Sequence, residues 1–296
     1  MQSIDLLMIA IKASILLTVL ALGLRANWRD ASYLFGHPGL LLRSLVAMNV
    51  LMPLVAAGLV VAFNLPSAVK VALIALAISP VPPILPKKQL KAGGDESYAI
   101  GLLVAIAVLS VIIVPASVSW FASIFDRSAE ISPLAVGKAV LASVLAPLAL
   151  GIVVHEWRPA LAERFAKPVG RVGTWMLIAS ALPLLYAAWP AIASLIGNGA
   201  AVLLAVMAMS GLAIGHMLGG PNADDRTVLA LSTASRHPAV ALAIGVAAGE
   251  ESKRALAAVL LYVLVAVIVS VPYVMWRKRL ARRPPVAVYA PKELSK

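Results

Sequence analysis

The stretch SPVPPILPKKQLKAGGD, residues 79–95, decides the fold because it interrupts a hydrophobic run. Its first eight residues contain four prolines, and two adjacent lysines, Lys87 and Lys88, follow them. The preceding apolar run begins at about Ala68 and is too short to cross a bilayer. A proline inside a helix removes a backbone hydrogen bond and frees a carbonyl, which a membrane tolerates only beside protein or a water-lined cavity. The stretch therefore predicts an unwound segment within a membrane helix.

The composition agrees with a membrane protein. The chain has 296 residues, of which 61% are hydrophobic and 13% charged, and its mean hydropathy is +0.95. Soluble domains carry about 25% charged residues. The apolar runs are continuous over roughly 20 residues, which is typical of helical spans and not of alternating barrel strands. The sequence predicts an all-α polytopic membrane protein whose first partner is the lipid bilayer.

Charge and cysteine content exclude other classes. The net charge is +12, but the basic residues lie mostly in short loops and the tail, so topology explains them better than nucleic-acid binding. The chain has no cysteine, which excludes disulfides, thiolate metal sites and cysteine nucleophiles. Neither a metal nor a cofactor is expected.

Apolar runs between charged or Gly/Pro-rich segments predict about nine membrane passages. They are expected near residues 5–25, 40–63, 67–93, 97–123, 132–154, 170–194, 199–219, 226–249 and 254–276. Lys and Arg collect in alternate loops and in the tail, so the N-terminus is expected outside and the C-terminus in the cytoplasm. The first run lacks a basic leader and a small-residue cleavage site, which indicates a retained span. The expected location is the bacterial inner membrane.

A second interruption lies in LALSTASRHPAVALAIG, residues 229–245, where Arg236, His237 and Pro238 fall near the middle of a span. The two breaks are about 150 residues apart, and a short half-helix and one further span follow each. Secondary transporters place such breaks in corresponding helices of inverted repeats. The predicted division is a first repeat (1–130, with its broken helix at 67–93), a second repeat (131–278, with its broken helix at 226–249) and a basic cytoplasmic tail (279–296).

Three stretches resemble the bile acid:sodium symporter superfamily. They are LALGLRANWRDASYLFGHPGLLLRSLVAMNVLMPLVA (20–56), SPVPPILPKKQLKAGGDESYAIGLLVAIAVLSVIIVP (79–115) and DRTVLALSTASRHPAVALAIG (225–245). The resemblance implies two inverted repeats, and a panel domain packed on a core domain with two crossing, discontinuous helices. It also implies that this chain lacks the extra leading helix of the ten-helix members.

The chain departs from the family at the sodium ligands. Carried over by position, these ligands fall on Met48, Leu85, Pro86, Leu231, Ser235 and Arg236, and on the stretch LVAIA (103–107). A hard cation such as sodium needs several oxygen ligands, and almost none remain. The resemblance, with these substitutions, implies a transporter that does not depend on sodium.

Fixed cations stand near the breaks instead. Charged side chains at membrane depth usually face a cavity or a partner, so Arg236, His237, Lys87 and Lys88 are the leading candidates for binding an anion. Arg236 suits a carboxylate or sulfonate, and His237 offers a route to proton coupling. Ser235, Pro86, Asn49 and Met48 complete the candidate substrate site.

Each candidate also has a structural interpretation. Lys87 and Lys88 can be interfacial lysines that reach the headgroups. Arg236 can form an ion pair or cap main-chain carbonyls, and His237 can bond carbonyls that Pro238 frees. Asn49 can line the cavity or bond a neighbouring helix.

The leading functional hypothesis is an alternating-access carrier for a small organic anion, in particular a carboxylate, acting as a monomer or a weak homo-oligomer. The alternatives are a sodium- or proton-coupled symporter of the same superfamily, and a channel or non-transporting sensor. An intramembrane enzyme would need an H-E-x-x-H pair, an aspartate dyad or a nucleophile with a base, and the sequence shows none of them.

Overall fold

The computed structural model describes residues 2–124, 132–196, 199–249 and 252–281, and every regular element in them is a helix. The helices of the first half are α1 (Gln2–Gly23), α2 (Trp28–Ser32), η1 (Tyr33–Gly36), α3 (Pro38–Leu45), η2 (Val46–Leu51), α4 (Met52–Ala62), α5 (Ser67–Ile78), α6 (Leu85–Lys91) and α7 (Glu96–Ile124). Those of the second half are α8 (Pro133–Val140), η3 (Leu141–Leu145), α9 (Ala146–Trp157), α10 (Pro159–Ile196), α11 (Ala200–Leu218), α12 (Ala223–Ala234), α13 (Pro238–Ala247) and α14 (Ser252–Ala281). The prediction of an all-α polytopic membrane protein is confirmed.

Six helical stretches of the described chain are long and apolar enough to cross a membrane. They are Pro38–Ala62, Glu96–Ile124, Pro133–Trp157, Pro159–Ile196, Ala200–Leu218 and Lys253–Ala281. A bent pair, α1 with α2 and η1, gives a seventh span if it is counted as one. The interrupted segments contribute only short helices, so the number of nine passages stays a prediction.

The first break follows from its prolines. Helix α5 ends at Ile78, residues 79–84 form no regular helix, and α6 begins at Leu85 with Pro86 in its first turn, where a missing N–H costs nothing. Beyond α6, Gly93 turns the chain with φ +81°, a conformation that glycine adopts without strain. The carboxylate of Asp95 then accepts the N–H of Tyr98 at 2.7 Å and so stabilises the start of α7.

The second break has the same form and contacts the first. Helix α12 ends at Ala234, residues 235–237 are not helical, with Ser235 and His237 extended, and α13 begins at Pro238. The N–H of His237 donates to the carbonyl of Pro80 at 2.9 Å, so the two unwound segments are hydrogen-bonded to each other. The predicted meeting of the two discontinuous helices is therefore present.

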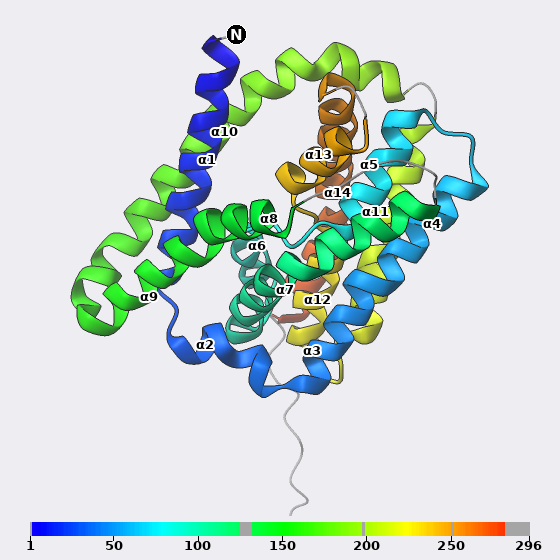
Figure 1. Cartoon of the computed structure of the whole chain (residues 1–296). Coiled ribbons are helices and arrows are strands. Elements are labelled where there is room, and N and C mark those ends of the chain that lie inside the picture. Colours follow the sequence, from blue (N-terminus) through cyan, green and yellow to red (C-terminus); the bar gives the residue numbers. More distant parts are fainter. Residues whose placement is uncertain (1, 125–131, 197–198, 250–251, 282–296) are drawn as a thin grey trace, which may run out of the picture.

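The helices pack as two groups. We call α1, the α8–α9 stretch and α10 the panel group, and they lie mainly on the left of Figure 1. Glycines let α1 approach α9 closely, since a Cβ at Gly23 would lie 2.3 Å from the carbonyl oxygen of Leu148. Helix α10 begins at Pro159, earlier than the expected span at 170–194, because Ala162 and Ala166 on its charged first turns are buried against Leu24.

A second set of helices, which we call the core group, shares one large buried cluster; it consists of α3–α4, α5, α6, α7, α11, α12, α13 and α14. Helix α11 contacts the backbone of α12 through glycines four residues apart, Gly211, Gly215 and Gly219. A Cβ at Gly215 would lie 2.5 Å from the Cα of Ala230. This close packing fixes the second broken helix within the core group.

Candidate functional site

Arg236 lies where the two breaks meet. Its side chain is 2% exposed, and its guanidinium donates from Nη1 to the carbonyl of Ser79 at 3.2 Å and from Nη2 to the carbonyl of Met48 at 2.9 Å. Its Nε has no hydrogen-bond partner among the described residues. The guanidinium therefore joins three segments of the core group, which are the second break, the end of α5 and η2.

The carbonyl of Met48 is free because of a π-helix and a proline. In η2 the N–H of Met52 donates to the carbonyl of Ala47, five residues earlier. In the same register the next donor would be the nitrogen of Pro53, which carries no hydrogen. Met48 was predicted through its side-chain position, but its main-chain oxygen is the atom that contacts Arg236.

The carbonyl of Ser79 is available because α5 stops there. Ser79 has extended dihedral angles, so its carbonyl points out of the helical hydrogen-bond series. A cation at the C-terminal end of a helix is favoured by the helix dipole. The contacts are those of the carbonyl-capping alternative, and Arg236 lines none of the three cavities described below. Its part in substrate binding stays a prediction.

His237 lines a cavity between the two helix groups. The cavity has a volume of about 460 Å³ and lies between α1, the α8–η3 stretch, α7, α13 and the first break. Its walls are almost entirely apolar, with Ile15, Val81 and Val140 among them, and Lys12 supplies a positive charge. The Nδ1 of His237 has no partner within the described chain. We call this space the apolar cavity.

The two adjacent lysines take different partners. The Nζ of Lys87 donates to the carbonyl of Gly170 at 3.0 Å and to the hydroxyl of Thr174 at 2.6 Å, both on α10 of the panel group. The Nζ of Lys88 donates to the hydroxyl of Ser270 on α14, within the core group. The structure therefore separates Lys88 from Lys87 and brings neither lysine to Arg236.

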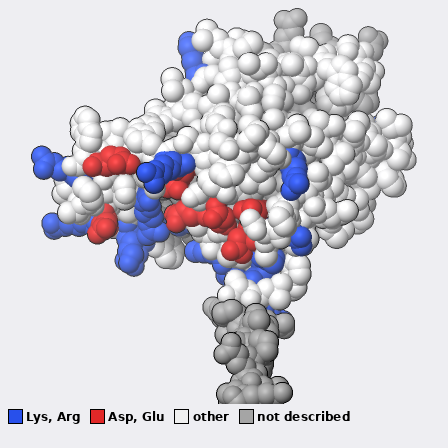
Figure 2. All heavy atoms as spheres, turned by 90° about the horizontal axis from the view of Figure 1, so that it is seen from below, with Lys and Arg blue, Asp and Glu red and all other residues white. Residues whose placement is uncertain are grey.

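Lys87 borders a second space, of about 270 Å³, between α1, α6 and α10. Four basic side chains line it, Arg25, Lys87, Lys167 and Arg171, together with one acid, Glu96. Figure 2 shows basic and acidic side chains gathered on the lower face of the molecule. We call this space the basic crevice.

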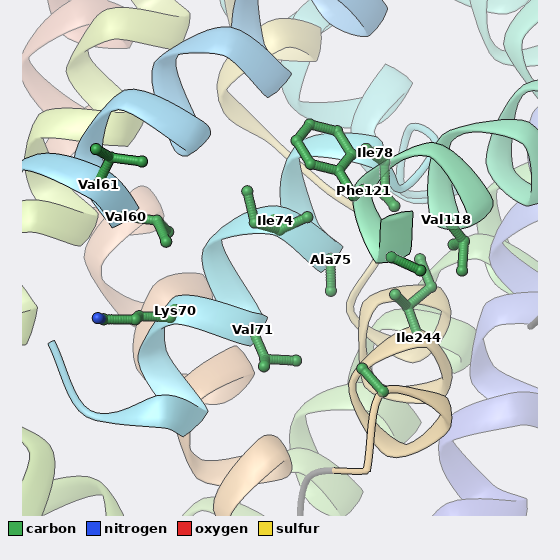
Figure 3. A pocket seen from close by; sticks show the side chains of 12 residues that line it. Val60, Val61, Lys70, Val71, Ile74, Ala75, Ile78, Val118, Phe121 and Ile244 are labelled. Carbon is green, nitrogen blue, oxygen red and sulfur yellow. The ribbon is translucent and has the colours of Figure 1, made fainter. Parts of the chain in front are cut away.

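A third cavity, of about 450 Å³, is lined from α4, α5, α7 and α13 and by Ala248, with no residue of the panel group (Figure 3). Its walls are apolar except for Lys70, which lies near the start of α5. Neither break contributes a charged residue to it.

The other predicted residues are Pro86, Asn49 and Ser235, whose side chains make no hydrogen bonds among the described residues. Pro86 is buried in the first turn of α6, Asn49 is half-buried in η2, and Ser235 is half-buried in the second break. The side chains of Asn49 and Ser235 have no hydrogen bond in the part of the chain that the structure describes. Nothing in their surroundings tests their predicted contact with substrate.

Gln89 is a polar contact that the sequence analysis missed. It is 1% exposed, and its Nε2 donates to the carbonyl of Val228 at 2.8 Å and to the hydroxyl of Ser232 at 2.6 Å. These bonds join α6, which follows the first break, to α12, which precedes the second break. The signal was an uncharged amide among three lysines of one short helix, which a search for charges passes over.

Metal binding has no evident basis in the described residues, because no group of three His, Cys, Asp or Glu side chains is placed to hold an ion. Most of the charged groups near the breaks are cations, with Glu96 the acid among them. The chemistry that the arrangement offers is therefore recognition of an anion.

Two interrupted helices that meet inside a helical membrane protein, next to cavities between two helix groups, define the architecture of a secondary transporter. The sequence profile of the Sodium Bile acid symporter family matches residues 13–204, which is well over half of the chain. The protein belongs to this family, which indicates a transporter of the bile acid/sodium symporter kind. The match includes the first break and ends before the second. A search of curated proteins finds no match.

Proposed function

We propose that the protein carries small organic carboxylates across the membrane by alternating access, without sodium and without enzymatic activity. The observation that carries this proposal is the bonding of Arg236 at the junction of the two breaks. Main-chain carbonyls freed at such junctions are suited to binding a hard cation. Here a permanent guanidinium occupies two of them.

The side-chain positions support the same conclusion. At the positions that the resemblance assigns to sodium ligands, Met48, Leu85, Pro86 and Leu231 offer no side-chain oxygen, and all four are buried. Sodium would have to displace a buried guanidinium and still find several oxygen ligands. In sodium-dependent members the bound ion supplies a positive charge, whereas in this proposal the chain itself supplies it.

The apolar cavity and the basic crevice supply a route for the anion. Pro80 and Val81 of the first break line the apolar cavity, while Pro83 and Lys87 line the basic crevice. Both spaces are bounded by α1 of the panel group. We propose that they are the two accesses of the carrier and that the loop 79–84 separates them. In the apolar cavity, Lys12 and His237 would bind the carboxylate.

The repeats, topology and assembly form part of the proposal. The order of a span, a span, a broken helix and a long helix occurs in α1, α3–α4, α5/α6 and α7, and again in α10, α11, α12/α13 and α14. The α8–α9 stretch then has no counterpart in the first half. This order supports a repeat boundary near residue 131. We also propose that the N-terminus lies outside and the C-terminus in the cytoplasm, and that the protein is a monomer or weak homo-oligomer in the bacterial inner membrane.

A proton-coupled carrier is the second candidate, because one observation favours it. His237 lines the apolar cavity, and its buried Nδ1 has no partner in the described residues, so no hydrogen bond to that atom fixes the protonation of the ring. His237→Gln would then abolish dependence of transport on a pH gradient, whereas the uncoupled carrier would show no such dependence in either form.

The experiment is a thermal-stability screen of the purified protein against carboxylates and sulfonates, in sodium chloride and in choline chloride. A ligand that binds the native state raises its apparent unfolding temperature. We expect a carboxylate to stabilise the protein equally in both salts and its flux into proteoliposomes to survive sodium removal. A strict sodium requirement would refute the proposal.

A lysine pair makes the site assignment testable. Lys12 and Lys70 are both lysines that line apolar cavities, but only Lys12 faces the panel–core interface beside His237. Lys12→Met should abolish the stabilisation by the carboxylate, while Lys70→Met should keep it. Equal effects of the two variants would remove the apolar cavity as the binding site.

A further inference from the structure

Lys87 forms hydrogen bonds across the boundary between the two helix groups. Helix α6 packs within the core group against α7 and α12, while Gly170 and Thr174 belong to α10 of the panel group. An alternating-access carrier must open and close this boundary, so the bonds of Lys87 hold it together at the crevice in the present conformation.

The partners of Lys87 on α10 are neutral, although its surroundings are strongly basic. The carbonyl of Gly170 and the hydroxyl of Thr174 accept its hydrogens, while Arg25, Lys167 and Arg171 line the same crevice. An anionic acceptor adds the Coulomb attraction between opposite charges to the hydrogen bond, which a neutral carbonyl or hydroxyl does not supply. A carboxylate or sulfonate that enters this space would therefore compete well for the ammonium group.

The backbone of α10 is shaped for the contact. A Cβ at Gly170 would lie 3.2 Å from the Cβ of Ala21 and 3.8 Å from the Nζ of Lys87, so the glycine lets α10 approach α1 and still receive the lysine. The hydroxyl of Thr174 donates to the carbonyl of Gly170 at 2.6 Å, which directs an oxygen lone pair to Lys87. Both acceptors lie on one turn of α10.

We propose that the basic crevice is an anion-binding vestibule in which Lys87 exchanges Gly170 and Thr174 for a carboxylate or sulfonate. This exchange frees α6 from α10, so arrival of the anion permits the two helix groups to separate at that end. The proposal rests on the proposed function, in which the crevice is one of the two accesses. Its ligand is the transported organic anion, and the alternative source of anionic charge is a lipid phosphate.

The test uses a single cysteine in a chain that has none of its own. Leu90→Cys places a thiol on the wall of the crevice. Its reaction rates are measured with a sulfonate-bearing and a trimethylammonium-bearing methanethiosulfonate, which are alike in size and opposite in charge. We expect the sulfonate to react about ten-fold faster, because a cleft lined by one sign of charge concentrates the opposite ion.

Four further variants, one of them a control, separate the charge from the hydrogen bonds. Lys87→Met should lower the ratio of sulfonate to trimethylammonium rates several-fold and raise the trimethylammonium rate, while Lys87→Arg should keep the ratio. Thr174→Val removes one acceptor without changing any charge, so it should raise both rates and leave the ratio unchanged. Lys88→Met is the matched control, because the Nζ of Lys88 bonds Ser270 inside the core group, and both rates should stay near those of the parent.

Three outcomes would overturn the proposal. They are a rate ratio near one in the parent, equal effects of Lys87→Met and Lys88→Met, and protection of the thiol from both reagents in phosphatidylglycerol but not phosphatidylcholine vesicles. The last would assign the crevice to lipid phosphate. None of these measurements involves sodium. A sodium requirement for transport would therefore refute the proposed function without contradicting anion binding in the basic crevice.

Discussion

Arg236 shows how a charge is kept inside an apolar protein. Insertion of an arginine at membrane depth costs about 2.5–3.5 kcal/mol. Hydrogen bonds that involve a charged group contribute about 1.5–3 kcal/mol each, so the bonds to Met48 and Ser79 together offset that cost. The residue stabilises the junction through acceptors that would otherwise be buried without donors.

We expect Arg236→Met to lower the free energy of unfolding by about 3 kcal/mol, because two buried carbonyls lose their donor at once. The free energy of unfolding of Arg236→Lys should fall between that of the parent and that of Arg236→Met, since an ammonium lacks the planar fork that reaches both carbonyls. Thermal unfolding of the purified variants in detergent measures the effect. An Arg236→Met variant as stable as the parent would show that the two bonds contribute nothing.

A substitution at Pro53 tests the same carbonyl of Met48 independently. Pro53→Ala would supply an N–H for the carbonyl of Met48, in the register of η2. The substitution should therefore recover about 1 kcal/mol in the Arg236→Met background, beyond its effect on the parent. A double-mutant cycle of unfolding free energies measures this coupling. Strict additivity would mean that the proline does not leave the carbonyl free.

The sequence predicted which charges lie at the breaks but not what they contact. Arg236 was expected at the junction, and it is there. Its acceptors lie 157 and 188 residues away in the chain, and one of them depends on a π-helix that no local pattern reveals. Lys87 and Lys88 looked equivalent because they are neighbours, yet successive helix positions point about 100° apart and so reach different helices.

At the scale of the elements, α11 depends on its glycines. Gly215→Ala would place a Cβ 2.5 Å from backbone atoms of α12, which cannot withdraw as a flexible side chain can. We expect it to destabilise the protein by about 2–3 kcal/mol, the cost of overpacking. Gly58→Ala in α4 is the control, because its Cβ would meet nothing within 4 Å.

Gly58→Ala should be neutral or stabilising by up to about 1 kcal/mol, since alanine is the better helix former. Apparent unfolding temperatures of the two variants, measured side by side, test the pair. If both lowered stability alike, the contact between α11 and α12 would not explain the loss at Gly215.

The helix ends of the structure agree with those predicted from the sequence where prolines mark them. Clustered prolines and Pro238 marked both breaks because a missing N–H ends a helix wherever it falls. The charged residues at the start of α10 suggested a loop, but tertiary packing of Ala162 and Ala166 continues the helix through them. The π-helices η2 and η3 were not anticipated, since their register depends on the prolines and on contacts with other helices.

At the scale of the whole molecule, the proposed topology makes opposite ends distinguishable. Gly39 and Asn64 are both exposed and lie at opposite ends of the same span, Gly39 in the first turn of α3 and Asn64 just after α4. With the N-terminus outside, a membrane-impermeant maleimide should label Asn64→Cys in intact cells and Gly39→Cys only in inside-out vesicles. The reverse pattern would invert the proposed orientation. The cysteine-free parent serves as the blank.

The hydrogen bonds of Arg236 also have an electrical consequence. In the proposed carrier, a guanidinium bound to both broken helices would return with them at the end of every cycle, so the net charge moved would be that of the substrate alone. An inside-negative potential drives a lone anion outward by about 2.3 kcal/mol per 100 mV for each charge. We therefore expect electrogenic transport that runs as export, and an imposed potassium diffusion potential in proteoliposomes should set its direction. Flux indifferent to voltage would mean that a co-ion travels with the substrate.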